Sequence, residues 1–211
     1  MGKIYTKHGD QGKTGLLYGG RISKSDPYLA AYGTTDEAVS ALGLARSLSD
    51  STDIKSIIKS LQEDLFTIGA ELSTSPKDYS KLQKHFTTVS EKMTLRLEEK
   101  IDELTGKFEL PKSFIIPGNS PTSSALDMAR TIVRRAEREA VKLYESNLLA
   151  NSEVLRYLNR LSDLLFILAR FNDRTKDFEQ FKDPSSKRSK SWIGEFEHTI
   201  VSRINSFIKY V

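Results

Sequence analysis

The 211-residue sequence contains no cysteine, and this absence excludes several kinds of chemistry. Disulfides, thiolate metal sites and a cysteine nucleophile are all ruled out. A chain without cysteine fits an intracellular protein, and we expect a cytoplasmic location. The sequence has only three histidines, His8, His85 and His198, and their spacing matches no metal-ligand motif. We therefore expect no metal centre built from protein ligands.

Long apolar runs are also lacking. No segment approaches the roughly 20 apolar residues needed to span a bilayer, and residues 1–7 lack the apolar core of a signal peptide. We expect no membrane partner. The length suits one domain with a sizeable core. The net charge of +4 suits anionic partners, but lysine and arginine are spread along the whole chain, so nucleic acid binding is not indicated.

The most prominent feature that is present is an uninterrupted segment from Pro121 to about Ser146. Ser120 followed by Pro121 is a typical helix start, because the hydroxyl caps the first turn and proline is tolerated there. Apolar residues then recur at helical spacing: Ala125, Met128, Ile132, Ala136 and Leu143. A charged stripe runs beside them: Arg130, Arg134, Glu137 and Arg138. Stacked cations repel one another, so the stripe is either a solvated face with Arg–Glu pairs or an anion-binding surface.

Residues 3–25 are predicted to form a glycine-rich loop. Glycine lets the backbone turn sharply and approach a ligand, and cations and hydroxyls add donors for a phosphate. These donors are Thr6, Lys7, Thr14, Arg21 and Lys24. The end of the loop imitates a Walker A motif, but Lys7 stands where that motif requires its first glycine. The alternative interpretation is a flexible N-terminal arm.

Apolar spacing predicts four further long helices, over about residues 34–48, 52–72, 91–104 and 152–172. The first would follow a short turn at Asp26-Pro27 and open with a capping box at Thr34–Glu37, which places Asp36 in its first turn. Residues 73–89 are predicted to be a polar connection. With the helix from Pro121, the pattern predicts an all-α, up-and-down five-helix bundle with a glycine-rich N-terminal loop.

The C-terminal part of the chain has a different composition. Residues 174–190 are dense in charge and are predicted to be a linker. Residues 191–211 have the spacing of an extra, amphipathic C-terminal helix. The expected organisation is therefore a bundle over residues 1–173, a linker and a terminal helix. The apolar face of that helix would dock on the bundle or on a partner.

Four blocks of sequence, in this order, resemble the trimeric, five-helix-bundle ATP:cob(I)alamin adenosyltransferases. The blocks are Tyr5–Thr14, Gly33–Glu37, Val133–Arg138 and Tyr157–Asp163. The resemblance covers roughly residues 3–173. It implies an enzyme that transfers the 5′-deoxyadenosyl group of ATP to the cobalt of cob(I)alamin, forming adenosylcobalamin and triphosphate. It also implies Mg²⁺, a homotrimer with ATP at the subunit interfaces, and as a further partner a cobalamin reductase or a B12-dependent enzyme.

The resemblance also implies roles for single residues. The loop would bind ATP through Thr6, Lys7, His8, Gly9, Thr14, Gly15 and Lys24. The arginine-rich helix and the last bundle helix would bind ATP through Arg134, Arg135, Glu137, Arg138 and Asn159. The catalytic residues would be Asp36, Phe114, Arg130 and Arg134, and the corrin-binding residues Phe114 and Asp163.

Within these roles, Arg130 would pair with Asp36 across the interface. Phe114 would lie at the lower face of the corrin, although by itself it could be an ordinary core residue. Arg134 and Lys24 would stabilise the leaving triphosphate. No general base is implied, because Co(I) is itself the nucleophile. Asn159 and Asp163 could also be satisfied within the bundle.

Two other function classes fit parts of the sequence. A nucleotide-sensing module would keep the loop and the arginines but would have no use for an aromatic residue aimed at a corrin. A basic helical adaptor for nucleic acid would need aromatic residues among its cations, and the arginine-rich helix has none at its centre.

Overall fold

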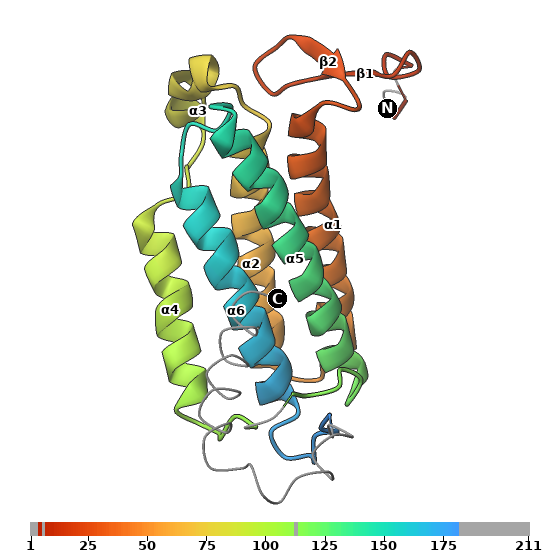
Figure 1. The fold of residues 1–211 in the computed structure, drawn as a ribbon, viewed down its shortest axis with the longest axis vertical. Coiled ribbons are helices and arrows are strands. Elements are labelled where there is room, and N and C mark those ends of the chain that lie inside the picture. Colours follow the sequence, from red (N-terminus) through yellow and green to blue (C-terminus); the bar gives the residue numbers. More distant parts are fainter. Residues whose placement is uncertain (1–3, 6, 112–113, 182–211) are drawn as a thin grey trace, which may run out of the picture.

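The computed structural model describes residues 4–5, 7–111 and 114–181, and these form an antiparallel helical bundle (Figure 1). The long helices are α1 (Pro27–Leu48), α2 (Thr52–Leu72), α4 (Glu91–Thr105), α5 (Pro121–Glu145) and α6 (Glu153–Asn172). This confirms the predicted all-α, five-helix bundle. The predicted helix over residues 191–211 lies outside the described residues. No described helix combines the length and apolar content needed to cross a membrane.

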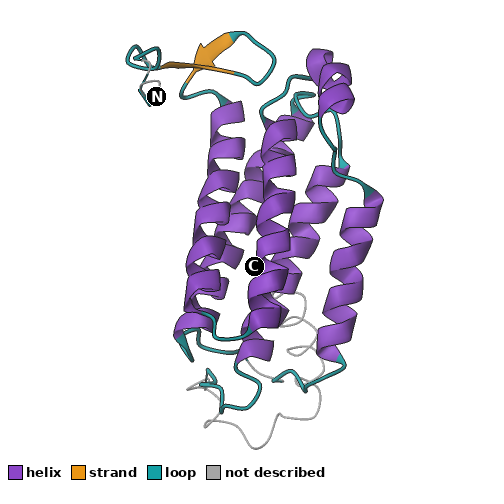
Figure 2. Ribbon diagram, turned by 180° about the vertical axis from the view of Figure 1, so that it is seen from behind, coloured by secondary structure: helices purple, strands orange, loops and turns teal. Residues whose placement is uncertain are grey.

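Short elements cover one end of the bundle (Figure 2). Strands β1 (Lys13–Gly15) and β2 (Arg21–Ser23) pair as an antiparallel hairpin, so part of the predicted loop is regular. The predicted polar connection between α2 and α4 contains the 3₁₀ turn η1 (Pro76–Asp78) and helix α3 (Tyr79–His85). The main-chain N–H of Leu17 donates to the Ser73 carbonyl at 3.1 Å, which ties the hairpin to the end of α2.

Helix α1 begins well before the predicted position. Asp26 is its N-cap and accepts a hydrogen bond from the second residue of the helix, with Pro27 at the first position. The capping box predicted from Thr34 is wrong, because Thr34 and Thr35 lie inside the helix and donate their hydroxyls to carbonyls one turn earlier. Asp36 therefore lies at an exposed position within the helix and not in its first turn.

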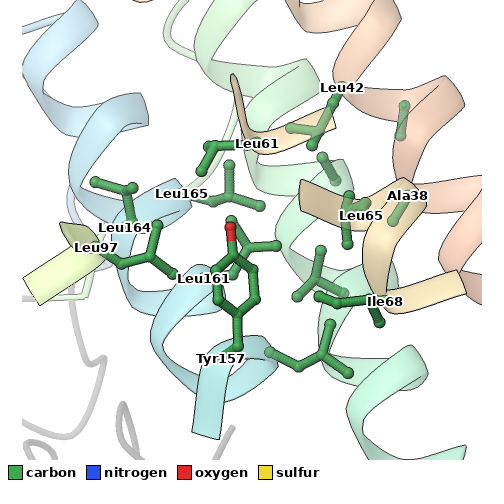
Figure 3. Close-up of a cluster of buried hydrophobic side chains, with 14 of the residues drawn as sticks. Ala38, Leu42, Leu61, Leu65, Ile68, Leu97, Tyr157, Leu161, Leu164 and Leu165 are labelled. Carbon is green, nitrogen blue, oxygen red and sulfur yellow. The ribbon is translucent and has the colours of Figure 1, made fainter. Parts of the chain in front are cut away.

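The core lies where α1, α2, α5 and α6 meet, and Figure 3 shows its leucine-rich centre. Helix α5 packs between α1 and α6, and α4 packs against α6. The buried face of α5 is rich in alanine, which allows its neighbours to approach closely. Met128 is 45% exposed, so its place in the predicted apolar stripe is wrong. The buried apolar residues of α5 are Ala125, Leu126, Ala129, Val133, Ala136, Ala140 and Leu143.

Buried polar contacts fix the helices around this core. The Tyr157 hydroxyl of α6 donates to Asp64 Oδ2 of α2 at 2.5 Å, and Arg96 of α4 pairs with the same carboxylate. Burial raises the pKa of Tyr157 well above its ordinary value, and the neighbouring Asp64 carboxylate adds to this effect. One carboxylate thus joins three helices, which fixes α6 and the side chains that it presents to α5.

Candidate active site

The N-terminal loop is organised around two glycines and Lys24. The main-chain N–H of Lys24 donates to the Gly12 carbonyl at 2.8 Å, and Gly12 has a φ of +70°, a value that glycine adopts without strain. A Cβ atom on Gly9 would lie 3.0 Å from Lys24 Nζ. The Lys24 amino group therefore lies against the backbone of the loop, in a place that a larger residue at position 9 would obstruct.

The other predicted ATP-binding residues of the loop are described by their backbone conformation and main-chain contacts. Lys7 adopts a left-handed conformation with a φ of +58°. The His8 carbonyl accepts a hydrogen bond from the Arg21 guanidinium, which fastens the loop to β2. Thr14 and Gly15 lie on β1. Thr6 lies outside the described residues.

Arg130, the first residue of the charged stripe on α5, lies close to a buried carboxylate of the same helix, Asp127. Arg130 Nε lies 3.7 Å from Asp127 Oδ1. Arg170 of α6 binds the other oxygen of Asp127, and the two side chains of this pair are only 4% and 6% exposed. The Arg170 guanidinium also lies 5.0 Å from the centre of the Phe166 ring. The stripe is therefore partly neutralised within its own chain.

This cluster keeps a positive charge, because two guanidinium groups share one carboxylate. Burial lowers the pKa of Arg130, the Asp127 carboxylate opposes this shift, and the neighbouring Arg134 and Arg170 charges lower it further. An arginine remains protonated under such a shift. The buried Nε atoms of Arg130 and Arg170 have no hydrogen-bond partner among the described residues. The cluster of Arg130, Asp127 and Arg170 therefore carries one positive charge that Asp127 does not neutralise.

The later residues of the stripe, Glu137 and Arg138, form hydrogen bonds with neighbouring groups. Asn159 of α6 donates to Glu137 Oε1 at 3.0 Å, so these two predicted ATP-binding residues lie together. Arg138 donates to the Arg134 carbonyl at 3.2 Å. The exposed Arg135 pairs with Glu37 of α1. Within the described part of the chain, the Arg134 guanidinium itself has no hydrogen bond or ion pair, although Arg130 lies close enough for their charges to interact.

The two predicted corrin-binding residues lie on different elements. Phe114 is half-buried in the connection from α4 to α5, and its carbonyl accepts the N–H of Phe181 at 2.8 Å. Asp163 of α6 pairs with Arg160 at 2.7 Å, and its side chain is 46% exposed. Asp163 therefore has an ion-pair partner on its own helix and is also accessible at the surface.

A single chain does not assemble the whole predicted site. The N-terminal hairpin lies beside the start of α1, whereas α5 starts at the opposite end of the bundle (Figure 1). Among the described residues, no hydrogen bond or ion pair joins the loop to the arginines of α5. Asp36 is exposed, and within the described part of the chain it forms no ion pair with Arg130, whose carboxylate neighbour is Asp127.

The sequence interpretation missed Asp127 and Arg170. Asp127 stands three residues before Arg130, a spacing that places the two side chains on one face of a helix. Arg170 interrupts the apolar C-terminal part of α6 and is 3% exposed. A charged residue in such a stretch indicates a buried partner, and that signal was available before the structure.

Comparison with known proteins gives a consistent result. Residues 4–172 match a family model described as cobalamin adenosyltransferase. A corrinoid adenosyltransferase of Citrobacter freundii is 37% identical over 177 residues, which are 84% of this chain and 98% of the relative. A corrinoid adenosyltransferase of Bacillus subtilis is 42% identical over 174 residues, which are 80% of this chain and 85% of the relative.

Solved structures agree with the sequence relatives. One is a phenylalanine-to-histidine variant of a PduO-type ATP:corrinoid adenosyltransferase from Lactobacillus reuteri, complexed with cobalamin and ATP. It matches with a TM-score of 0.79 and 38% identity, over 86% of this chain and 97% of that chain. An arginine-to-lysine variant from the same organism, complexed with ATP, matches with a TM-score of 0.76 and 37% identity, over 85% and 100% of the two chains.

Proposed function

Because this chain belongs to the corrinoid adenosyltransferase family, we propose that it transfers the 5′-deoxyadenosyl group of ATP to the cobalt of cob(I)alamin. The Co(I) centre donates an electron pair to C5′, a cobalt–carbon bond forms, and the bond from C5′ to the α-phosphate oxygen breaks. The products are adenosylcobalamin and triphosphate. The observation that carries the proposal is the half-buried pair Arg130 and Arg134 in a chain whose residues 4–172 match the family.

The proposed role of α5 is to stabilise the leaving group. Negative charge grows on the triphosphate as the C5′–O bond breaks, and a fixed cation at that place lowers the barrier. Arg134 has a guanidinium that forms no ion pair with the described residues, and it lies on a helix that packs against α1 and α6. Arg130 is held at Asp127, one turn below it. Such side chains need little reorganisation during the reaction.

The proposed role of the N-terminal loop is to hold the triphosphate of ATP. Lys24 supplies a cation beside Gly9, in a loop whose turns at Lys7 and Gly12 have positive φ. Mg²⁺ would enter with ATP as part of the substrate, since it is usually bound by phosphate oxygens, water and few protein groups. Thr14 and Gly15 would belong to the same surface.

We further propose that the site is assembled between subunits of a homotrimer. The loop of one subunit would face the α5 stripe of the next, which accounts for their separation within one chain. Asp36 of one subunit would then reach Arg130 of its neighbour and neutralise the remaining positive charge of the Asp127 cluster. The exposure of Asp36 and the excess positive charge around Arg130 support this arrangement.

The corrinoid would lie against Phe114, with Asp163 near its edge. As the family resemblance implies, the aromatic ring at the lower face would displace the axial base and make cobalt easier to reduce. A cobalamin reductase or a B12-dependent enzyme as partner, and a cytoplasmic location, are further proposals that rest on the sequence interpretation.

The test is anaerobic incubation of the protein with Mg-ATP and chemically reduced cobalamin. Loss of the Co(I) absorption spectrum and formation of triphosphate should proceed with matched stoichiometry. The Arg134→Ala variant should lower kcat/KM by roughly 10²–10³-fold, as for the loss of one preorganised donor at a developing charge.

The matched control is Arg156→Ala, since Arg156 is an exposed arginine of α6 that pairs with Glu153. It should change kcat/KM by no more than about twofold, as surface substitutions usually do. An unchanged rate in Arg134→Ala would remove Arg134 from the mechanism. Binding of ATP without its consumption would favour the nucleotide-sensing alternative.

A further inference from the structure

The residues that follow α6 are attached to the connection that carries Phe114. Residues 114–120 are the last part of the connection from α4 to α5, and they lead directly into α5. Residues 173–181 contact this part at both of its ends. The family model matches residues 4–172, and residues 173–181, called the tail segment here, directly follow that match.

The first attachment is at the N-cap of α5. Ser120 donates its hydroxyl to Asp173 Oδ2 at 3.1 Å, and Asn172 donates to the Ser120 hydroxyl oxygen at 3.1 Å. Asp173 is 0% exposed. Burial raises the pKa of this carboxyl, but hydrogen bonds from the serines at the start of α5, Lys176 and Asn172 outweigh burial, so the pKa lies below its ordinary value. The charged carboxylate thus fixes the start of the tail segment to the start of α5.

The second attachment is a short antiparallel bridge. Ile115 and Gln180 lie opposite each other. The N–H of Phe181 donates to the Phe114 carbonyl at 2.8 Å, and the N–H of Ile116 donates to the Glu179 carbonyl at 2.8 Å. Both hydrogen bonds come from residues that flank the bridge, which is the pattern of a non-hydrogen-bonded pair. The main-chain N–H of Gln180 donates no hydrogen bond in this bridge.

The two attachments hold residues 114–120 at Phe114 and at Ser120. A connection of this length with free ends would sample many backbone conformations, and each fixed residue costs conformational entropy on binding. Here the Phe114 carbonyl is held by one tail residue and the far end of the connection by another. These contacts therefore restrict the main-chain position of Phe114 relative to the start of α5.

We propose that residues 173–181 are a positioning segment for the corrinoid half of the site, acting through the main chain of Phe114 and Ile116. This inference rests on the proposed adenosyl transfer, in which Phe114 contacts the corrin. Among the described residues, no hydrogen bond or ion pair joins the tail segment to a residue proposed to bind ATP. We therefore expect the tail segment to affect the affinity for the corrinoid and not the affinity for ATP.

The test compares three variants of the full-length chain. Phe181→Pro removes the N–H that donates to Phe114, and Gln180→Pro introduces the same residue at the adjacent position, whose N–H is not used. Phe181→Ala keeps the N–H and removes the ring, which is 54% exposed. KM for cob(I)alamin and KM for ATP are measured for each, together with the absorption spectrum of cob(II)alamin bound in the presence of Mg-ATP.

Phe181→Pro should raise KM for cob(I)alamin about fivefold, as expected for the loss of one main-chain hydrogen bond that orders the site. KM for ATP should stay within about twofold, as should both constants of Gln180→Pro and Phe181→Ala. The spectrum of bound cob(II)alamin should change in Phe181→Pro alone. Amide hydrogen exchange at Ile116 should accelerate in Phe181→Pro and not in Gln180→Pro, which reports loss of the bridge independently of activity.

Equal effects of Phe181→Pro and Gln180→Pro, or of Phe181→Pro and Phe181→Ala, would overturn the inference. A parallel rise of KM for ATP would do the same, because it would indicate a general structural defect. An inactive wild-type protein would instead contradict the proposed function. The two failures are therefore distinguishable.

Discussion

The buried pair of Asp127 and Arg170 offers a sharp test of the energetics of α5. Replacing Arg170 by methionine keeps a long side chain but leaves the Asp127 carboxylate without its main partner. Removing one member of a buried ion pair typically costs about 3–5 kcal/mol, because the remaining charge is desolvated and unpaired. Arg130 lies 3.7 Å from the other oxygen of Asp127 and compensates in part. We therefore expect a loss of about 3 kcal/mol, at the lower end of that range.

The measurement is urea unfolding of Arg170→Met followed by circular dichroism. The protein concentration is kept fixed, because association of subunits adds to the apparent stability. Arg174→Met is the matched control: this arginine is exposed and lies 4.0 Å from the centre of the Phe171 ring. The control should lose less than about 1 kcal/mol, the usual contribution of an exposed cation over a ring.

A double variant, Asp127→Leu with Arg170→Met, separates charge from packing. It should recover part of the loss, because no carboxylate is then left buried without a partner. A loss below about 1 kcal/mol in Arg170→Met would refute the reasoning, since it would mean that Asp127 is solvated or is fully satisfied by Arg130. The same outcome would also argue against the proposed ion pair between Arg130 and Asp36 of a neighbouring subunit, because Arg130 would then already be neutralised by Asp127.

Two further predictions concern carboxylates. The pKa of Asp173 lies below its ordinary value of 3.8, so its carboxylate stabilises the fold above that pH and the stabilisation is lost as the pH falls through the lowered value. Asp173→Asn should therefore show a flatter pH dependence of the free energy of unfolding in this acidic range, measured by urea unfolding at several pH values, and an unchanged slope would contradict the assignment. Asp36→Asn should raise the dissociation constant of the proposed trimer about tenfold or more in sedimentation experiments, because it removes one partner of the proposed interface charge pair. Asp50→Asn, an exposed acid between α1 and α2, is the control, and equal behaviour of the two variants would exclude Asp36 from the interface.

Much of the fold could be predicted from local patterns. Apolar residues at helical spacing gave the long helices α2, α4, α5 and α6 to within about one residue at each end. The start of α1 was predicted wrongly. Thr34–Glu37 has the residues of a capping box, but the preceding turn is buried against the rest of the bundle: Tyr28 is 6% exposed and donates its hydroxyl to the Leu148 carbonyl at 2.9 Å. Tertiary packing therefore extends the helix backwards, as packing often overrides a local preference.

In the candidate site, too, some features could be predicted from the sequence and others depend on the tertiary structure. The sequence alone determined the helical bundle, the family and the stripe of arginines, because these depend on the periodicity of one helix and on ordered motifs. The tertiary structure decided which charges meet: Arg170 stands 43 residues from Asp127, and Phe181 lies far from Phe114 along the chain. No local spacing relates such residues. Only the packing of α5 against α6, and the return of the chain past the start of α5, brings them into contact.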